Sequence, residues 1–361
     1  MQIISYNRKQ LEEFIGDEFF KVLSKIPISY HRAISHINNP YCSDEDVLLW
    51  AAYEKASLVG YIGVLPDIFQ INGKESKIYW LSCFWVEESF RNENLASQLF
   101  FLLIKQYKDQ LFISNFLFSL EKTYQSLGIF QPTQYNYGHT FYLNFCFAGL
   151  LQARFPKLKP FIPFYRLVEN IFNRILVVGK LLYKKKSNNY EVVDNNLFDE
   201  DLNNFLRTFL VSDNHVVRNM EHFRWIQTYP WVLTGRSDKE SARYHFTSKS
   251  EQFVYKMVKF YSSGELSCFL FLKIRDKILT VSYLYSCDDY ISQITDYLLQ
   301  FSLDNKLNAI VVFDKRLSDL LKNKRSRFIY VKPTKQAYIF PKDFKIDASV
   351  FQEGDGDSVF T

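Results

Sequence analysis

The sequence predicts an α+β fold built on a mixed, mostly antiparallel twisted sheet that is flanked by helices. Two observations carry this prediction. Runs rich in aromatic and β-branched residues, which favour strands, alternate with runs whose apolar residues recur at helical spacing. The order of helices, strand meander, helix, strand, helix and strands also occurs twice along the chain, which predicts two similar domains in tandem.

Composition sets the protein class. The chain has 361 residues, is nearly half apolar, and carries a net charge of +5 without a basic recognition motif, so we do not expect it to bind nucleic acid. Its five cysteines are widely spread and form no C-x-x-C pair, which indicates neither a disulfide framework nor a metal site. No signal peptide or long apolar run is visible, and we therefore expect a cytoplasmic protein.

The first half of the chain gives clear element signals. Strands are expected at residues 2–6, 47–53, 58–71, 76–86, 111–115 and 137–145, and helices at 11–23, 95–104 and 120–127. The segment 26–46 is polar and is expected to be irregular. Asn72 and Gly73 form a two-residue hairpin signal between two of the strands.

A strand, a polar loop and a helix follow one another at residues 76–107. Val86, Arg91, Asn94 and Ala96 fit the pattern V-x4-R-x-x-G-x-[GA], with Asn94 in place of the usual glycine, and residues 124–128 read Y-x-x-L-G. The start of a helix after a strand offers free N–H groups and a positive dipole end, which suit phosphates. Over residues 1–147 the chain resembles the GNAT superfamily of acyl-CoA-dependent N-acyltransferases.

The resemblance implies acetyl-CoA as the acyl donor and assigns roles to residues. The backbone of the strand end, from Phe84 to Glu87, would hold the pantetheine and the thioester carbonyl, and the following loop would cradle the pyrophosphate. The implied donor-binding residues are Phe84, Val86, Arg91, Asn92, Glu93, Asn94, Leu95, Ala96 and Ser97. Tyr124 would protonate the leaving thiolate, and the alternative is a tyrosine that only packs its ring beside Leu127. Glu87, or its neighbour Glu88, would accept the proton of the amine, and the alternative is that both are solvated loop carboxylates.

Other residues near this unit have alternative interpretations. Asn tolerates positive φ better than most residues, so Asn94 is compatible with the loop geometry. His31 and His36 fall where the acceptor would enter, and each is either a substrate contact or a structural residue. Cys83 lies on the central strand without an activating histidine and is expected to belong to the core.

We expect a domain over 1–148, a linker over 149–189 and a second domain over 190–361. The stretch 154–186 is strongly basic and contains a predicted amphipathic helix at 165–183. One interpretation is a connector that packs on both domains. The other is a peripheral contact with an anionic membrane surface.

The second half repeats the first but departs from it at the loop. Helices are expected at 199–210, 217–229, 288–303 and 317–322, and strands at 190–193, 243–248, 251–262, 265–274, 277–287, 309–313, 327–331 and 336–340. Asp288 and Asp289 stand where a pyrophosphate loop would begin, and they would repel phosphate. We therefore expect only the first copy to bind CoA. The acidic segment 353–357 predicts a flexible tail, with a lid or a cation site as alternatives.

The resulting hypothesis is a tandem protein that transfers an acetyl group from acetyl-CoA to a small amine. The aromatic-rich strands at 253–284 suggest an amino sugar of surface polysaccharide synthesis as the acceptor. An aminoacyl transferase of the peptidoglycan-bridge type and a non-catalytic binding module remain alternatives. The sequence leaves the acyl chain length and the oligomeric state open.

Overall fold

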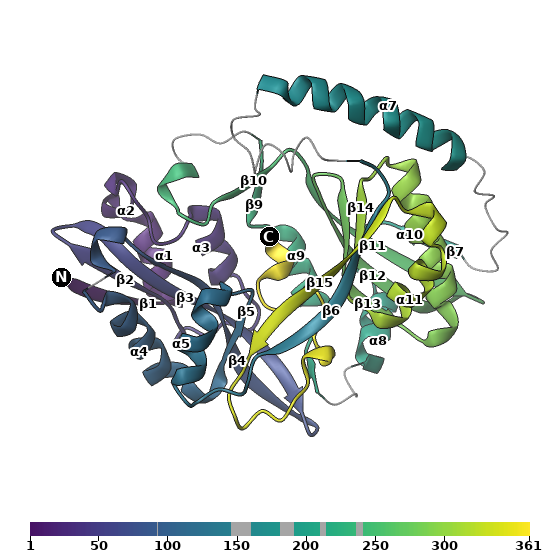
Figure 1. Cartoon of the computed structure of the whole chain (residues 1–361). Helices are drawn as coiled ribbons and strands as arrows, with labels where there is room; N and C mark the ends of the chain where they lie inside the picture. The colour runs from purple at the N-terminus through teal and green to yellow at the C-terminus, as the bar shows by residue number, and fades with distance from the viewer. Residues whose placement is uncertain (92, 146–159, 181–190, 210–213, 236–240) are drawn as a thin grey trace. The chain divides into compact units, whose positions relative to one another are not determined.

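A computed structural model describes residues 1–91, 93–145, 160–180, 191–209, 214–235 and 241–361 (Figure 1). Two compact units comprise these residues. Unit 1 contains Met1–Asn136, Phe198–Phe253 and Gln336–Thr361, and unit 2 contains Tyr137–Leu197 and Val254–Lys335. These bounds differ from the expected domains 1–148 and 190–361, because helices from the second half and the C-terminal segment pack into unit 1. Of the expected linker 149–189, residues 149–159 and 181–189 lie outside the described residues.

The sheet of unit 1 begins as an antiparallel meander and then adds a parallel strand. Its meander consists of β1 (Gln2–Asn7), β2 (Val47–Glu54), β3 (Ser57–Ile71) and β4 (Lys74–Val86). Strand β5 (Leu111–Ser114) runs parallel to β4, and the end of β15 (Tyr330–Ile339) pairs antiparallel with β5. The expected hairpin is confirmed, because Asn72 and Gly73 both have positive φ between β3 and β4. The predicted mixed α+β fold is confirmed.

Helices cover both faces of this sheet. One hydrophobic core joins the sheet to α1 (Arg8–Gly16), α2 (Glu18–Val22) and α3 (Tyr30–Ile37), and a second joins it to α4 (Leu95–Tyr107) and α5 (Glu121–Ser126). The helix expected at 11–23 is divided at Asp17, whose carboxylate caps α2 by accepting a hydrogen bond from the Phe19 N–H at 2.6 Å. The expectation of an irregular segment at 26–46 was wrong for α3, whose buried face includes polar residues and therefore hides the helical pattern.

Segments from the second half of the chain complete unit 1. They are α8 (Glu200–Phe209), β8 (His215–Val216), α9 (Met220–Thr228), β9 (Val232–Thr234) and β10 (Ser248–Ser250). Strand β8 pairs with β3, and the indole of Trp225 on α9 donates to the Ser35 carbonyl at 2.7 Å. The strand expected at 243–248 was wrong, because that segment contains a short 3-10 turn at Ser241–Arg243 and only the start of β10.

The C-terminal segment is anchored by a buried ionic triad. The Arg218 guanidinium donates to both carboxylate oxygens of Asp67 at 2.8 and 2.9 Å and to Asp355 at 3.0 Å, and all three side chains are buried. Burial raises the pKa of Asp355 to about 7, although Arg218 acts to lower it. The expected flexible tail at 353–357 was therefore wrong. Its partner Arg218 is remote in sequence, so the acidic composition alone indicated solvent exposure.

Unit 2 repeats the arrangement of a meander, a helix, a parallel strand and a helix. Its strands are β7 (Glu191–Asp194), β11 (Phe253–Ser262), β12 (Glu265–Arg275), β13 (Ile278–Ser286), β14 (Ala309–Val312) and the end of β6 (Gln134–Tyr142). Helices α10 (Ile291–Asp304) and α11 (Lys315–Asn323) pack on one shared core with them. The two short strands expected at 327–331 and 336–340 form the single strand β15 instead.

Helix α7 (Ile162–Lys180) also belongs to unit 2 and matches the helix expected at 165–183. Phe164, Leu167 and Ile171 on this helix are more than half exposed. Among the described helices, none combines the length and the apolarity that crossing a bilayer would require.

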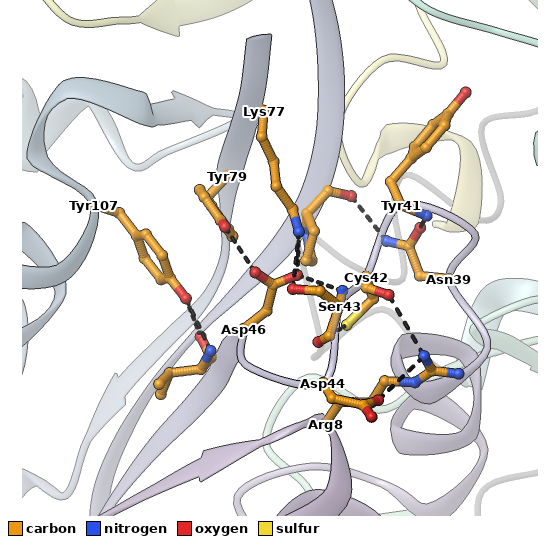
Figure 2. Close-up of polar contacts among 12 residues, drawn as sticks. Arg8, Asn39, Tyr41, Cys42, Ser43, Asp44, Asp46, Lys77, Tyr79 and Tyr107 are labelled. Carbon is orange, nitrogen blue, oxygen red and sulfur yellow. Dashed lines mark hydrogen bonds and ion pairs between the residues drawn. The ribbon is translucent and has the colours of Figure 1, made fainter.

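A polar network fixes the loop before β2 to strand β4 (Figure 2). The buried Asp46 carboxylate accepts hydrogen bonds from the Ser43 N–H at 2.7 Å, the Lys77 ammonium at 2.5 Å and the Tyr79 hydroxyl at 2.8 Å. Burial acts to raise the pKa of Asp46, but these three donors outweigh it and lower that pKa. The network therefore stabilises the folded state only while Asp46 is ionised.

Asp46→Asn should lower the free energy of unfolding by about 2 kcal/mol, because the lost charge weakens three buried hydrogen bonds. The pKa of Asp46 is lower in the folded than in the unfolded state, so its contribution is present above about pH 4 and is lost as the pH falls through the folded-state pKa. Urea unfolding between pH 3 and 7 measures both effects. The neighbouring control Asp44→Asn, at a half-exposed carboxylate, should cost about 0.5 kcal/mol or less. Equal losses in the two variants would contradict this interpretation.

Candidate functional site

Strands β4 and β5 separate halfway along β4. They pair from Tyr79 to Leu81, whereas β4 continues to Val86 on β3 alone within the described sheet. Ser82 is the extra residue of a β-bulge, because Leu81 faces Val64 and Cys83 faces Gly63 on β3. The bulge directly follows the last residue of β4 that pairs with β5, and beyond it one edge of the β4 backbone has no strand partner in the described sheet.

Backbone groups of β4 face this open edge. The Glu87 N–H donates to the Val59 carbonyl of β3 at 2.9 Å. Because backbone groups alternate in direction along a strand, the N–H groups of Phe84 and Val86 face away from β3. Both residues lie in the segment 84–87, whose main chain is predicted to hold an acyl carrier, whereas the Glu87 N–H of that segment is used within the sheet.

The expected phosphate loop leads into helix α4. Asn94 has φ 58° and ψ 12° at the N-cap, so it adopts the left-handed geometry expected of it, and its side chain makes no capping hydrogen bond. The first-turn N–H groups of Leu95, Ala96 and Ser97 have no intrahelical acceptor. Leu95 is fully buried, and a Cβ on Gly60 would lie 3.1 Å from its Cδ2, so the glycine permits close packing of α4 on β3.

Charged residues surround the start of α4. The Arg91 side chain is 62% exposed and lies 3.8 Å from the Glu88 carboxylate, and Glu93 is exposed. The loose contact leaves the guanidinium able to turn toward a phosphate. Asn92 lies outside the described residues.

Tyr124 is positioned by aromatic packing. It lies on α5, is buried, and has ring-centroid distances of 5.3 Å to Phe100 of α4 and 5.6 Å to Phe116. Burial raises its pKa to about 12. The phenol is therefore protonated at neutral pH, as an acid that donates to a thiolate must be.

Glu87 follows the last residue of β4 and forms an ion pair with Lys25. Its hydrogen bond with the Lys25 ammonium lowers the pKa of Glu87. The carboxylate is thus ionised at neutral pH and could accept a proton, although its lowered pKa makes it a weak base.

The two histidines of the predicted acceptor side contact Trp231. One ring nitrogen of His31 lies 2.9 Å from the Trp231 carbonyl, and the buried His36 ring stacks on the Trp231 indole. Burial lowers the pKa of both histidines. Cys83 is buried, as predicted, and burial raises its pKa.

Sequence reasoning missed the residues that meet at the bulge. Arg32 of α3 donates to the Ser82 carbonyl at 2.9 Å and to the Ser82 hydroxyl at 2.5 Å, and that hydroxyl donates to Asp357 at 3.4 Å. These residues come from three distant segments, and no local motif connects them. Within the described residues, no His, Cys, Asp and Glu side chains group in a way that could hold a metal ion.

The aromatic residues that suggested a sugar acceptor are mostly buried. Phe260, Phe269, Phe271 and Tyr283 of unit 2 are fully buried. They form part of the packed sheet, so they are not a stacking surface for a sugar. In the same unit, Asp288 precedes α10 and forms an ion pair with Arg316 at 2.7 Å.

Comparison with known proteins gives a family match for residues 9–128 and solved structures with a similar fold. A family model described as the acetyltransferase (GNAT) family matches residues 9–128. No curated protein sequence matches the chain. A solved structure from Enterococcus faecalis V583, described as a conserved protein of unknown function and probable N-acyltransferase, is 9% identical with a TM-score of 0.56 and covers 94% of this chain and 72% of its own.

Two further structures overlap nearly the whole chain. A GCN5-related N-acetyltransferase from Anabaena variabilis ATCC 29413 is 6% identical, with a TM-score of 0.49 over 93% of this chain and 72% of its own. The N-myristoyltransferase of Saccharomyces cerevisiae with bound myristoyl-CoA is 13% identical, with a TM-score of 0.47 over 94% of this chain and 82% of its own.

Asn94→Gly should keep or improve acetyl-CoA binding, because glycine adopts positive φ without strain. Asn94→Val should lower the free energy of unfolding by about 1–2 kcal/mol, because a β-branched residue disfavours left-handed geometry. Calorimetric titration with acetyl-CoA and thermal unfolding of both variants measure this difference. Equal affinity in the two variants would show that the Asn94 backbone geometry does not matter for the donor.

Proposed function

We propose that the chain transfers an acetyl group from acetyl-CoA to a primary amine, because a model of the acetyltransferase (GNAT) family matches residues 9–128. The observation that carries the proposal is the bulge at Ser82, beyond which the β4 edge is free in the described sheet, directly before the helix start at Leu95. Thioester binding needs an open strand edge, and pyrophosphate binding needs free helix N–H groups. Unit 1 has both within one strand–loop–helix segment.

The donor would lie along this segment. The pyrophosphate would accept hydrogen bonds from the N–H groups at the start of α4, with Arg91 adding a positive charge. The pantetheine and the thioester carbonyl would accept from the N–H groups of Phe84 and Val86. These donors are fixed in the fold before the substrate arrives, so they can stabilise the charge on the oxygen during attack.

Acyl transfer then requires two proton movements. The neutral amine nitrogen attacks the thioester carbon, the new C–N bond forms, and the C–S bond breaks with its electron pair on sulfur. Glu87 would take the proton that the amine loses, directly or through water, and Tyr124 would give its proton to the thiolate. Solvent exchange returns both side chains to their starting states.

The donor side does not specify the acceptor. The amino-sugar hypothesis rested on aromatic residues that the fold uses as core, so we name the acceptor here only as a primary amine. Two alternatives make different predictions. A non-catalytic module would bind acetyl-CoA without releasing thiol to any amine, and an aminoacyl transferase would use aminoacyl-tRNA and ignore acetyl-CoA.

Tyr124→Phe should lower kcat by about 100-fold, because the leaving thiolate loses its proton donor. Acetyl-CoA affinity should stay nearly unchanged, because the ring and its packing remain. Thiol release with a panel of amines measures kcat, and calorimetry measures affinity. Tyr137→Phe, at an exposed tyrosine, is the matched control. A fully active Tyr124→Phe enzyme would exclude this residue as the acid.

Lys25→Met should shift the acidic limb of the pH–rate profile to higher pH. The Lys25 ammonium lowers the pKa of Glu87, so its removal raises that pKa, and the base then becomes ionised only at higher pH. Glu87→Gln should remove this limb and lower kcat. If both variants keep the wild-type pH profile, another group accepts the proton of the amine.

A further inference from the structure

Arg32 is a buried cation at the bulge of β4. Its side chain comes from α3 and only 4% of the residue is exposed. The guanidinium carbon lies 3.9 Å from the centre of the Trp231 ring and 5.8 Å from that of Tyr244, so aromatic faces enclose it. The cation is thus held rigidly next to Ser82.

Most of the hydrogen-bonding capacity of this guanidinium is unused. Only Nη2 donates to a protein group, and both of its bonds go to Ser82. Nη1 and Nε find no acceptor in the part of the chain that the structure describes, and no carboxylate there forms an ion pair with Arg32. A buried charge is costly unless it is paired, so these free N–H groups favour an anionic ligand.

Asp357 is a second charged residue near the Ser82 bulge. The Ser82 hydroxyl accepts from Arg32 and donates to the half-buried Asp357, so Asp357 is connected to the cation through Ser82 and not by direct contact. The Arg32 cation and the Asp357 carboxylate therefore both bind the Ser82 hydroxyl.

Ser82, which Arg32 contacts, lies on β4 near the place where the acceptor would approach. In the proposed function, CoA runs from the start of α4 back along Val86 and Phe84, so its acyl end reaches toward Ser82. The acceptor amine must approach that end. Arg32 therefore lies where a second group of the acceptor would be held.

We infer that Arg32 binds a carboxylate of the acceptor, and hence that the acceptor is an amine of the amino-acid class. This inference rests on the proposed function and makes its acceptor more specific. Nη1 supplies the hydrogen bond to the carboxylate, the rings of Trp231 and Tyr244 exclude water, and Ser82 fixes the orientation of the guanidinium.

The wild-type full-length protein gives the first test. L-α-amino acids, their C-terminal amides and their decarboxylated amines serve as matched acceptors, together with neutral amino sugars, and thiol release from acetyl-CoA is followed. We expect kcat/KM for the best amino acid to exceed that for its amide by about 100-fold or more, because an amide leaves the buried cation unpaired. Turnover of amides or amino sugars at least as fast overturns the inference and leaves the proposed function intact. The absence of turnover with every amine overturns both.

Variants of Arg32 give the second test. Arg32→Gln should reduce the preference for the acid over the amide to about one, and this ratio is the readout, because loss of the contact with Ser82 lowers the turnover of both acceptors. Arg32→Lys should retain part of the preference, since it keeps the charge without the planar fork. An equal fall in kcat/KM for acid and amide would instead assign Arg32 a structural or oxyanion role. If Arg32→Gln does not fold, as thermal unfolding would show, the wild-type ratio decides alone.

Discussion

The β-bulge at Ser82 is the constraint on which the candidate site depends. Strand β5 pairs with β4 only up to Leu81, so the N–H groups of Phe84 and Val86 beyond the bulge are not used in that pairing. Beyond Leu81, β3 still holds β4 on its other side. An open backbone edge therefore exists in a strand that is otherwise rigid. Catalysis by fixed dipoles requires this combination of free donors and a rigid support.

Buried charges reinforce the same region of unit 1. Arg32 holds the bulge through Ser82, and the Arg218 pair with Asp67 and Asp355 fixes the C-terminal segment, while the Trp80 indole of β4 donates to Asp67 at 2.9 Å. Buried ion pairs add little net stability, because desolvation offsets their attraction. Breaking one leaves an unpaired buried charge, which is costly. These contacts consequently fix one arrangement of segments that are distant in sequence.

Local patterns made much of this fold predictable. Short stretches of sequence determine the aromatic strands of both units, the Asn72-Gly73 hairpin and the strand–loop–helix motif. The left-handed geometry of Asn94 follows from its place in that motif. The site beyond the motif was not predictable. Arg32 lay in a segment that appeared irregular because its buried helical face is polar, and Asp355 appeared solvated because its partner Arg218 is remote in the chain.

The bounds of the two compact units differ from the predicted domain boundaries for the same physical reason. The repeated order of elements indicated where each copy begins, but it did not reveal that β6 and β15 each run from one unit into the other or that the C-terminal segment packs into unit 1. Long-range packing decides these assignments. A tandem sequence therefore predicts the number of copies better than the identity of the segments that complete each one.

A thermal-shift titration of the full-length protein with acetyl-CoA tests the central claim most directly. Binding to the folded state alone adds about 2.7 kcal/mol of stability at a ligand concentration 100 times the Kd. The account predicts a saturable rise of Tm for the wild type, and a rise that needs higher concentrations in Arg91→Ala, whose loop lacks the guanidinium. No rise at millimolar acetyl-CoA, or identical titration curves for the two proteins, would contradict a donor site at the start of α4.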